Sequence, residues 1–246
     1  MTALDDLAAT PFHAADAPAR ARMLSRLADT ELSVALSAEP TGDRISLRMF
    51  PLESGAVALA CDSEDRLADF LAAPVAYAAL PGRVLAGLLR AEGAGLLVNP
   101  GHPSEMLLDA AMLDWLSGAL SSAPEAAEAR LRLTAPARAT VEALAEPLAA
   151  RLADMRGLMA GAALAGVAGE GGPSSHLLLI AGAEAARQPA LAKALAEALA
   201  FLPAQPGGVD ISFSETTPPP GALRFDLSAP EAIAPPARPK RPPILR

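Results

Sequence analysis

Hydrophobic and polar residues alternate in three short runs near the start of the chain, at 32–36, 45–49 and 57–61. Alternation with a period of two is typical of strands that bury one face against a core. Turn-forming segments rich in Gly, Pro, Ser and acidic residues separate the runs, at 39–43 and 53–55. The pattern therefore predicts an antiparallel meander of three strands.

Apolar residues spaced three and four positions apart predict helices in the same half of the chain. Asp16 and Pro18 form a helix start, because Asp caps backbone N–H groups and Pro suits the first turn. An acidic start at 62–65 precedes an apolar stripe that includes Leu67 and Phe70. The further elements are a strand at 75–80, a helix opened by Pro81 and Gly82, a strand at 95–98 and a helix capped by Asp109.

The second half of the chain predicts strands and helices in a different order. These elements are a strand at 131–134, a helix at 139–153, strands at 158–167 and 175–181, a helix at 184–202, a strand at 209–214 and a last strand at 223–227. The first six follow the order β-α-β-β-α-β, which is typical of ferredoxin-like domains. We therefore expect an α+β fold of two small mixed modules, the first built on the meander and the second ferredoxin-like.

Two changes of composition divide the chain. The stretch 122–128 is small, polar and contains Pro, which indicates a domain boundary. From residue 229 onwards the chain is rich in proline, has no hydrophobic periodicity and carries an excess of basic residues, as is typical of disorder. We predict an N-terminal domain at 1–122, a C-terminal domain at 129–228 and a disordered basic tail at 229–246.

Charge and composition exclude several classes of function. The chain has a net charge of −8 and only 3% aromatic residues, which argues against a groove that binds nucleic acid by stacking and basic charge. A single cysteine, Cys61, excludes an internal disulfide, and the three histidines lack metal-ligand spacing, so we expect no metal and no cofactor. The start lacks the features of a signal peptide, and the apolar run 158–167 is about half of a membrane span. We therefore expect a cytoplasmic protein that makes no membrane contact.

Three segments of the first half occur together in a recognisable order: FPLESGAVALACDSEDRLADF, YAALPGRVLAGLL and GLLVNPGHPSEMLL. In this set the chain resembles the SseB (enhanced serine sensitivity) family of bacterial proteins. The second half resembles that family's C-terminal domain by the order of its elements. The resemblance implies a link to serine sensitivity, but it implies no reaction, cofactor or catalytic residue.

The segment NPGHPSEMLL at 99–108 groups His102 and Ser104 behind a turn. A hydrolase of the Ser-His type needs a base in hydrogen-bond reach of the hydroxyl and a third group that orients the base. The G-x-S-x-G turn that exposes such a serine is absent from the sequence. We therefore interpret the segment as the corner between a strand and a helix, with a partner-binding or ligand-binding role for Asn99, Gly101, His102 and Glu105.

A second candidate is the neighbouring turn of Pro81, Gly82 and Arg83. Backbone N–H groups at a helix start, together with an arginine, can hold an anion, although no nucleotide-binding fingerprint supports this. Cys61 lies at the end of a strand before acidic residues, which disfavour a thiolate, so we expect a packed cysteine. We assign no catalytic residue.

The sequence thus favours a non-catalytic protein-interaction or regulatory module whose protein partner is unknown. One alternative is a sensor domain for a small molecule such as an amino acid, which rests on analogy with other ferredoxin-like modules. Another is a hydrolase or sulfur-handling enzyme that uses Ser104 or Cys61. A homodimer is a further expectation, because the open edges of a ferredoxin-like sheet favour self-association.

Overall fold

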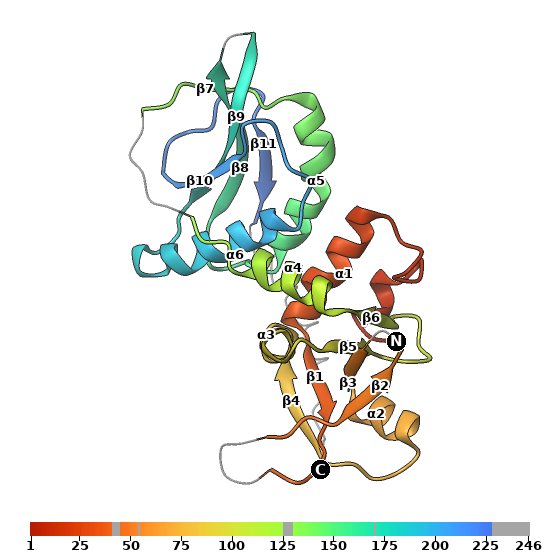
Figure 1. Cartoon of the computed structure of the whole chain (residues 1–246). Coiled ribbons are helices and arrows are strands. Elements are labelled where there is room, and N and C mark those ends of the chain that lie inside the picture. The colour runs from red at the N-terminus through yellow and green to blue at the C-terminus, as the bar shows by residue number, and fades with distance from the viewer. Residues whose placement is uncertain (41–44, 54, 125–129, 170, 228–246) are drawn as a thin grey trace, which may run out of the picture.

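A computed structural model of the chain describes residues 1–40, 45–53, 55–124, 130–169 and 171–227. The predicted tail at 229–246 lies outside the described residues, as do parts of the predicted turns and of the predicted boundary at 122–128. The described residues form two halves, each with its own mixed sheet and helices (Figure 1). The predicted α+β class is confirmed.

The first half contains most of the predicted elements, but the strand predicted at 45–49 is only an isolated bridge at Leu47, and the strand there begins at Met49. Its helices are η1 (Asp5–Leu7), α1 (Ala17–Asp29), α2 (Glu64–Leu71), α3 (Gly82–Glu92) and α4 (Ala110–Leu120), and its strands are β1 (Glu31–Ala35), β2 (Met49–Leu52), β3 (Gly55–Cys61), β4 (Tyr77–Pro81), β5 (Gly95–Val98) and β6 (Met106–Leu108). The predicted caps are confirmed, since Asp16 accepts a hydrogen bond from Ala19 N and Asp109 accepts one from Met112 N, both at 2.8 Å. The short strand β6 was not predicted.

The first sheet corrects the predicted meander. Its strand order is β4-β1-β3-β5-β6, and β2 also pairs with β3. In place of a β1-β2-β3 succession, β1 pairs with the end of β3 at Cys61 and β2 pairs with its beginning at Val57. β3 spans seven residues and is therefore long enough to hold both shorter partners on one edge, while β5 runs parallel to it on the other edge.

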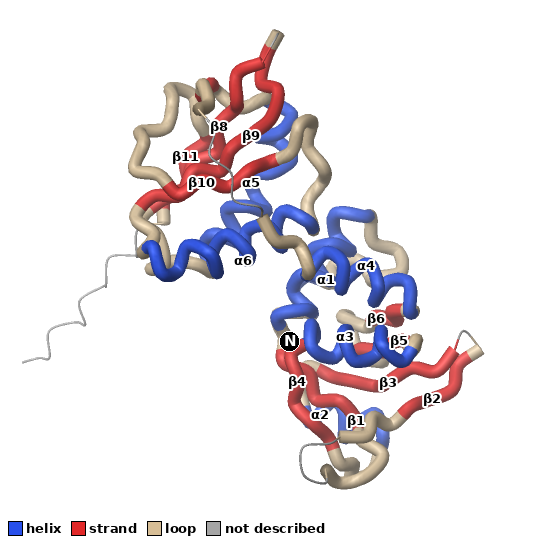
Figure 2. The backbone as a smooth tube through the Cα atoms, turned by 60° about the vertical axis from the view of Figure 1, so that its left-hand side comes forward, coloured by secondary structure: helices blue, strands red, loops and turns tan. Residues whose placement is uncertain are grey.

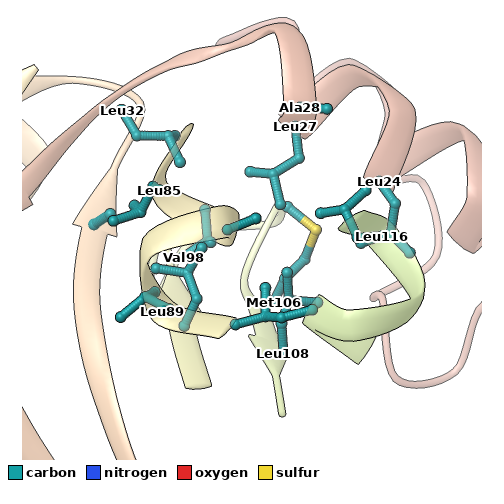
Figure 3. Close-up of a cluster of buried hydrophobic side chains, with 14 of the residues drawn as sticks. Leu24, Leu27, Ala28, Leu32, Leu85, Leu89, Val98, Met106, Leu108 and Leu116 are labelled. Carbon is teal, nitrogen blue, oxygen red and sulfur yellow. The ribbon is translucent and has the colours of Figure 1, made fainter. Parts of the chain in front are cut away.

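Helices cover both faces of the first sheet. Residues of α1, α3 and α4 bury their apolar sides against one face, and α2 packs on the other face through Leu67 (Figure 2). In the larger cluster, Leu27 of α1 and Leu89 of α3 lie over Val98 and Met106 of the sheet (Figure 3). One prediction is wrong in detail, because Phe70 of the expected stripe on α2 is 50% exposed.

The second half contains every element that the pattern predicted. These are β7 (Leu133–Thr134), α5 (Arg138–Ala153), β8 (Gly161–Gly169), β9 (Gly172–Ala181), η2 (Ala185–Arg187), α6 (Gln188–Ala200), β10 (Val209–Phe213) and β11 (Leu223–Asp226). The ferredoxin-like arrangement is not confirmed. A split β-α-β unit has another strand between the two strands that its helix joins, whereas β10 pairs directly and in parallel with β9.

Helices cover only one face of the second sheet. Its order is β10-β9-β8-β11, with β7 on the same edge of β8 as β11. Leu164, Leu178 and Ile180 pack against the leucines of α5 and α6. The alternate residues, among them Leu177 and Leu179, lie on the opposite face in a smaller cluster. This second face matters below, since no helix packs on it among the described residues.

Candidate functional site

The corner at 99–105 is built on Asn99, the residue that directly follows β5. Its φ angle of 46° is in the left-handed region, which Asn tolerates better than most residues. Asn99 is fully buried, and its Oδ1 accepts a hydrogen bond from Asp62 N at 2.9 Å. Its Nδ2 donates to Ser104 Oγ at 2.9 Å. The asparagine therefore joins the ends of β3 and β5 and closes the loop that follows.

The same hydrogen bonds continue into a buried polar network around Asp5. Ser104 Oγ donates to Asp5 Oδ1 at 2.6 Å. The Arg66 guanidinium pairs with Asp5 at 2.5 Å and with Asp62 at 3.0 Å. The hydrogen bond from Arg66 holds the pKa of Asp5 far below its usual range, against the opposing effect of burial. Charge, burial and hydrogen bonds thus fix η1 against the corner.

This geometry gives Ser104 and Cys61 structural roles and leaves neither one available as a nucleophile. Ser104 is fully buried and its hydroxyl proton is donated to a carboxylate, so the hydroxyl is not presented to a substrate. Burial raises the pKa of the Cys61 thiol to about 11, and its side chain has no exposed surface. A thiol needs its thiolate form and access to react. Among the described residues, no three His, Cys, Asp or Glu side chains gather where they could hold a metal ion.

The rest of the corner is presented to solvent. Gly101 N donates to Glu105 Oε2 at 2.6 Å, and Glu105 N donates to the His102 carbonyl oxygen at 2.9 Å. His102 is half-buried, while Gly101 and Glu105 are exposed. Of the residues that the sequence put forward in this segment, these three are accessible and Asn99 is not.

The turn at Pro81 and Gly82 is a close approach between two helices. A Cβ on Gly82 would lie 2.0 Å from the Leu27 carbonyl oxygen, so only glycine fits at this position. Gly82 N also donates to the Thr30 carbonyl oxygen at 2.9 Å. Pro81 ends β4, which runs parallel to β3 and β5, so this turn lies on the same sheet edge as the corner. Two strands separate them, a distance of about 14 Å from strand spacing alone.

Arg83 connects the two halves. Its guanidinium pairs with Asp29 at the end of α1 at 2.5 Å and with Glu197 of α6 at 3.1 Å. Arg151 of α5 also pairs with Asp29, at 2.9 Å. Although burial raises the pKa of Asp29, the two arginines outweigh it and hold that pKa below its usual value. The side chain that the sequence offered for anion binding is therefore already paired with acidic residues of this chain.

Further contacts complete this junction. Lys193 pairs with Glu197 at 2.8 Å and donates to the Leu120 carbonyl oxygen at 3.2 Å. Trp115 of α4 and Phe201, just after α6, meet edge to face with their ring centroids 5.6 Å apart. Phe201 is buried within the core cluster of the first half. The halves are thus joined by apolar packing as well as by charge.

A groove of about 140 Å³ runs along the junction between α1 and the second half. Its apolar lining residues include Leu7, Pro147, Phe201 and Leu202, and its charged lining residues are Arg22, Arg26 and Asp29 from α1 and Arg151 and Asp154 from α5 and its end. Arg151 Nε is buried and has no hydrogen-bond partner among the described residues. Sequence reasoning missed this groove, because its residues come from segments that are distant in the chain. The available signal was the basic pair Arg22 and Arg26, one turn apart on a helix of an acidic protein.

Comparison with known families bears on the first half. Residues 7–115 match the model of the SseB protein N-terminal domain. This range contains the corner, the turn at 81–83 and most of the buried network. Searches of the curated proteins and of the solved structures found no match. The first half is therefore similar to the SseB N-terminal domain, while the expected SseB C-terminal domain is not shown by these comparisons.

None of the helices in the described parts of the chain combines the length and the apolar character needed to cross a bilayer.

Proposed function

We propose that this protein is a non-catalytic, SseB-like interaction or regulatory protein that binds an acidic, amphipathic segment of a partner protein. The docking site is the groove between the halves. The observation that carries the proposal is a groove lined by three arginines and several apolar side chains on a chain whose net charge is −8. A bacterial, cytoplasmic setting and a link to serine sensitivity belong to the proposal and rest on the resemblance to SseB proteins.

The charges of the groove favour an acidic occupant. Arg22 and Arg26 are exposed, and the structure pairs neither with a carboxylate within its described residues. The groove carboxylates, Asp29 and Asp154, are both engaged by Arg151. A partner carboxylate would therefore meet two open guanidinium groups, which bind carboxylates through paired hydrogen bonds.

The residues that the sequence put forward support the walls of this groove. The network around Asn99 and Ser104 holds Asp5, and two residues further on Leu7 lines the groove. Arg83 holds Asp29, which also lines the groove. We propose that these residues position the groove, and that Gly101, His102 and Glu105 form a second, smaller contact at the exposed corner.

A binding assay tests the groove. The probe is a fluorescein-labelled 14-residue peptide of Glu and Leu at helical spacing, with the Lys-for-Glu peptide as a charge control. We expect Arg22→Gln/Arg26→Gln to weaken binding at least about tenfold, as the loss of two charge-assisted contacts implies. The matched variant Arg138→Gln/Arg187→Gln removes two exposed arginines elsewhere and should stay within about twofold of the wild type.

Equal effects of the two double variants, or binding that does not saturate, would refute the proposal. Sedimentation at several concentrations addresses a second copy as the occupant. Self-association that Arg22→Gln/Arg26→Gln abolishes would replace the acidic partner with a homodimer. Glu105→Ala tests the second contact at the exposed corner. Asn99→Ala would not test it cleanly, because truncating the buried Asn99 would disturb the whole network.

A further inference from the structure

The second sheet carries a hollow of about 350 Å³ that the function proposed above does not use. Its floor includes Gly161 and Ala163 of β8 and Leu179 and Ala181 of β9. Gly161 pairs with Ala181, and Ala163 pairs with Leu179, so the four residues form two adjacent rows on one face. This is the face turned away from α5 and α6.

The hollow exists because the floor residues are small. A Cβ added to Gly161 would meet no atom within 4 Å, so open space begins directly above the backbone of β8. The segment after β10 forms the opposite wall through Ser214, Thr216 and Pro218. This wall is held in place, because Glu215 Oε1 accepts a hydrogen bond from Gly182 N at 2.9 Å.

One rim of the hollow presents hydrogen-bond donors. Arg224 of β11 pairs with Ala163 in the ladder, and its exposed side chain lines the hollow. In the described part of the chain the acceptor of its guanidinium is the Pro218 carbonyl oxygen, at a long 3.5 Å. Ser214 Oγ donates to Thr216 Oγ1 at 2.7 Å, which leaves the Thr216 hydroxyl proton to be donated elsewhere.

The guanidinium of Arg224 sets the charge that a ligand must carry. Asp226 lies two residues from Arg224 and lines the hollow as well. A single carboxylate can pair with the planar guanidinium. The alanine and leucine floor suits a short aliphatic chain.

We propose that this hollow is a binding site for a small aliphatic monocarboxylate, whose carboxylate pairs with Arg224 and whose carbon chain lies on Ala163 and Leu179. The site is built by the second half alone. It is therefore independent of the groove between the halves, and failure of either proposal leaves the other standing.

An NMR titration of the ¹⁵N-labelled full-length chain with butyrate tests the site. We expect saturable amide shifts at Gly161, Ala163 and Ala181, with a dissociation constant in the millimolar range that suits so small a ligand. Butylamine, which lacks the carboxylate, should leave these amides unshifted.

Two variants test separately the charge of the Arg224 guanidinium and the open volume of the hollow. Arg224→Gln should weaken butyrate binding about tenfold, and Gly161→Leu, which fills the hollow, should abolish it. Arg138→Gln is the matched control and should bind as the wild type does. Dispersed spectra verify that each variant is folded. Unsaturable shifts, shifts that map elsewhere, or equal binding by Arg224→Gln would overturn the proposal.

L-2-aminobutyrate distinguishes two sources of the same carboxylate chemistry. Tighter binding than butyrate assigns the site to amino acids. Weaker or equal binding assigns it to simple carboxylic acids. Either result supports a monocarboxylate site, provided that Arg224→Gln weakens both ligands.

Discussion

Two polar clusters of the molecule, one in each half, differ in burial and in how far their groups are hydrogen-bonded. In the first half, Asp5, Arg66, Asn99 and Ser104 are buried and bonded to one another. In the second half, Arg224 lies on the rim of an open hollow with one long hydrogen bond. Ser104, which the sequence suggests as a nucleophile, therefore has a structural role. The accessible polar side chain is Arg224, which lies beside a floor of alanine and glycine residues.

The difference follows from how helices cover the two sheets. Helices pack on both faces of the first sheet, so polar side chains at its strand ends become enclosed and must satisfy each other. Helices pack on one face of the second sheet, and a loop crosses part of the other face. Small residues beneath that loop leave a space that larger side chains would fill.

The largest expected effect comes from breaking the buried network. Asp5→Ala leaves the Arg66 guanidinium without its shortest ion pair and Ser104 without its acceptor. Removing one partner of a buried pair typically costs about 3–5 kcal/mol in the free energy of unfolding. Urea denaturation followed by circular dichroism measures this loss.

Arg224→Ala is the matched test in the other half. We expect it to change the free energy of unfolding by less than about 0.5 kcal/mol, as is usual for an exposed side chain. If the two variants lost similar stability, the contrast between a structural and an open polar cluster would be wrong.

The junction between the halves gives the next largest effect. Phe201→Ala removes a buried ring from the core of the first half and from its contact with Trp115. Truncation of a buried Phe costs about 3 kcal/mol or more in the free energy of unfolding. Trp115 is the single tryptophan of the chain, so its fluorescence reports directly on this contact.

Phe70→Ala is the control for this effect, because Phe70 is half exposed. We expect it to cost less than about 1 kcal/mol and to leave the fluorescence of Trp115 unchanged. A Phe201→Ala variant with unchanged fluorescence and stability would mean that the halves are joined by charge alone.

Local elements of the fold were readable from the sequence, and their pairing was not. The helix starts at Asp16 and Asp109 could be predicted because each cap accepts a hydrogen bond from a backbone N–H only three residues further along the chain. Strand pairing is decided between distant segments, so neither the attachment of β1 to the end of β3 nor the direct pairing of β9 with β10 left a local signal. The patterns predicted most of the elements but not β6, and they predicted the wrong order of strands in the sheet.

The candidate sites show the same limit. The structural role predicted for the corner followed from Asn99 and Gly101, whose turn preference is local. Asp5 is 99 residues away from Ser104, and nothing in the sequence joined them. Arg83 was singled out for its place at a helix start, but its partners Asp29 and Glu197 come from two other helices. The sequence therefore identified residues that matter to the structure, but it did not reveal which distant residues they contact.

A pair of glycines in one helix tests the close approach at the turn. Gly82→Ala places a Cβ against the Leu27 carbonyl oxygen and should lower the free energy of unfolding by about 2 kcal/mol through overpacking. Gly87→Ala has open space around it in the middle of α3 and should raise that energy by up to about 1 kcal/mol. Thermal denaturation of both variants gives the comparison, and a loss of stability in both would disprove the steric explanation.

The smallest expected effect concerns His176, the one buried histidine among the described residues. Its Nε2 accepts a hydrogen bond from Ala137 N at the start of α5, at 3.2 Å. Burial lowers the pKa of His176 below its ordinary value of 6.5. The unfolded chain therefore binds a proton more readily than the folded protein, so stability is retained above pH 6.5 and declines as the pH falls below it.

His176→Gln keeps an acceptor for Ala137 N and removes the titration. Between pH 7 and 5.5 the wild type should lose about 1 kcal/mol more in the free energy of unfolding than this variant. His13→Gln, which removes an exposed histidine, should follow the wild type. Parallel pH profiles for His176→Gln and the wild type would mean that protonation does not break the contact with α5.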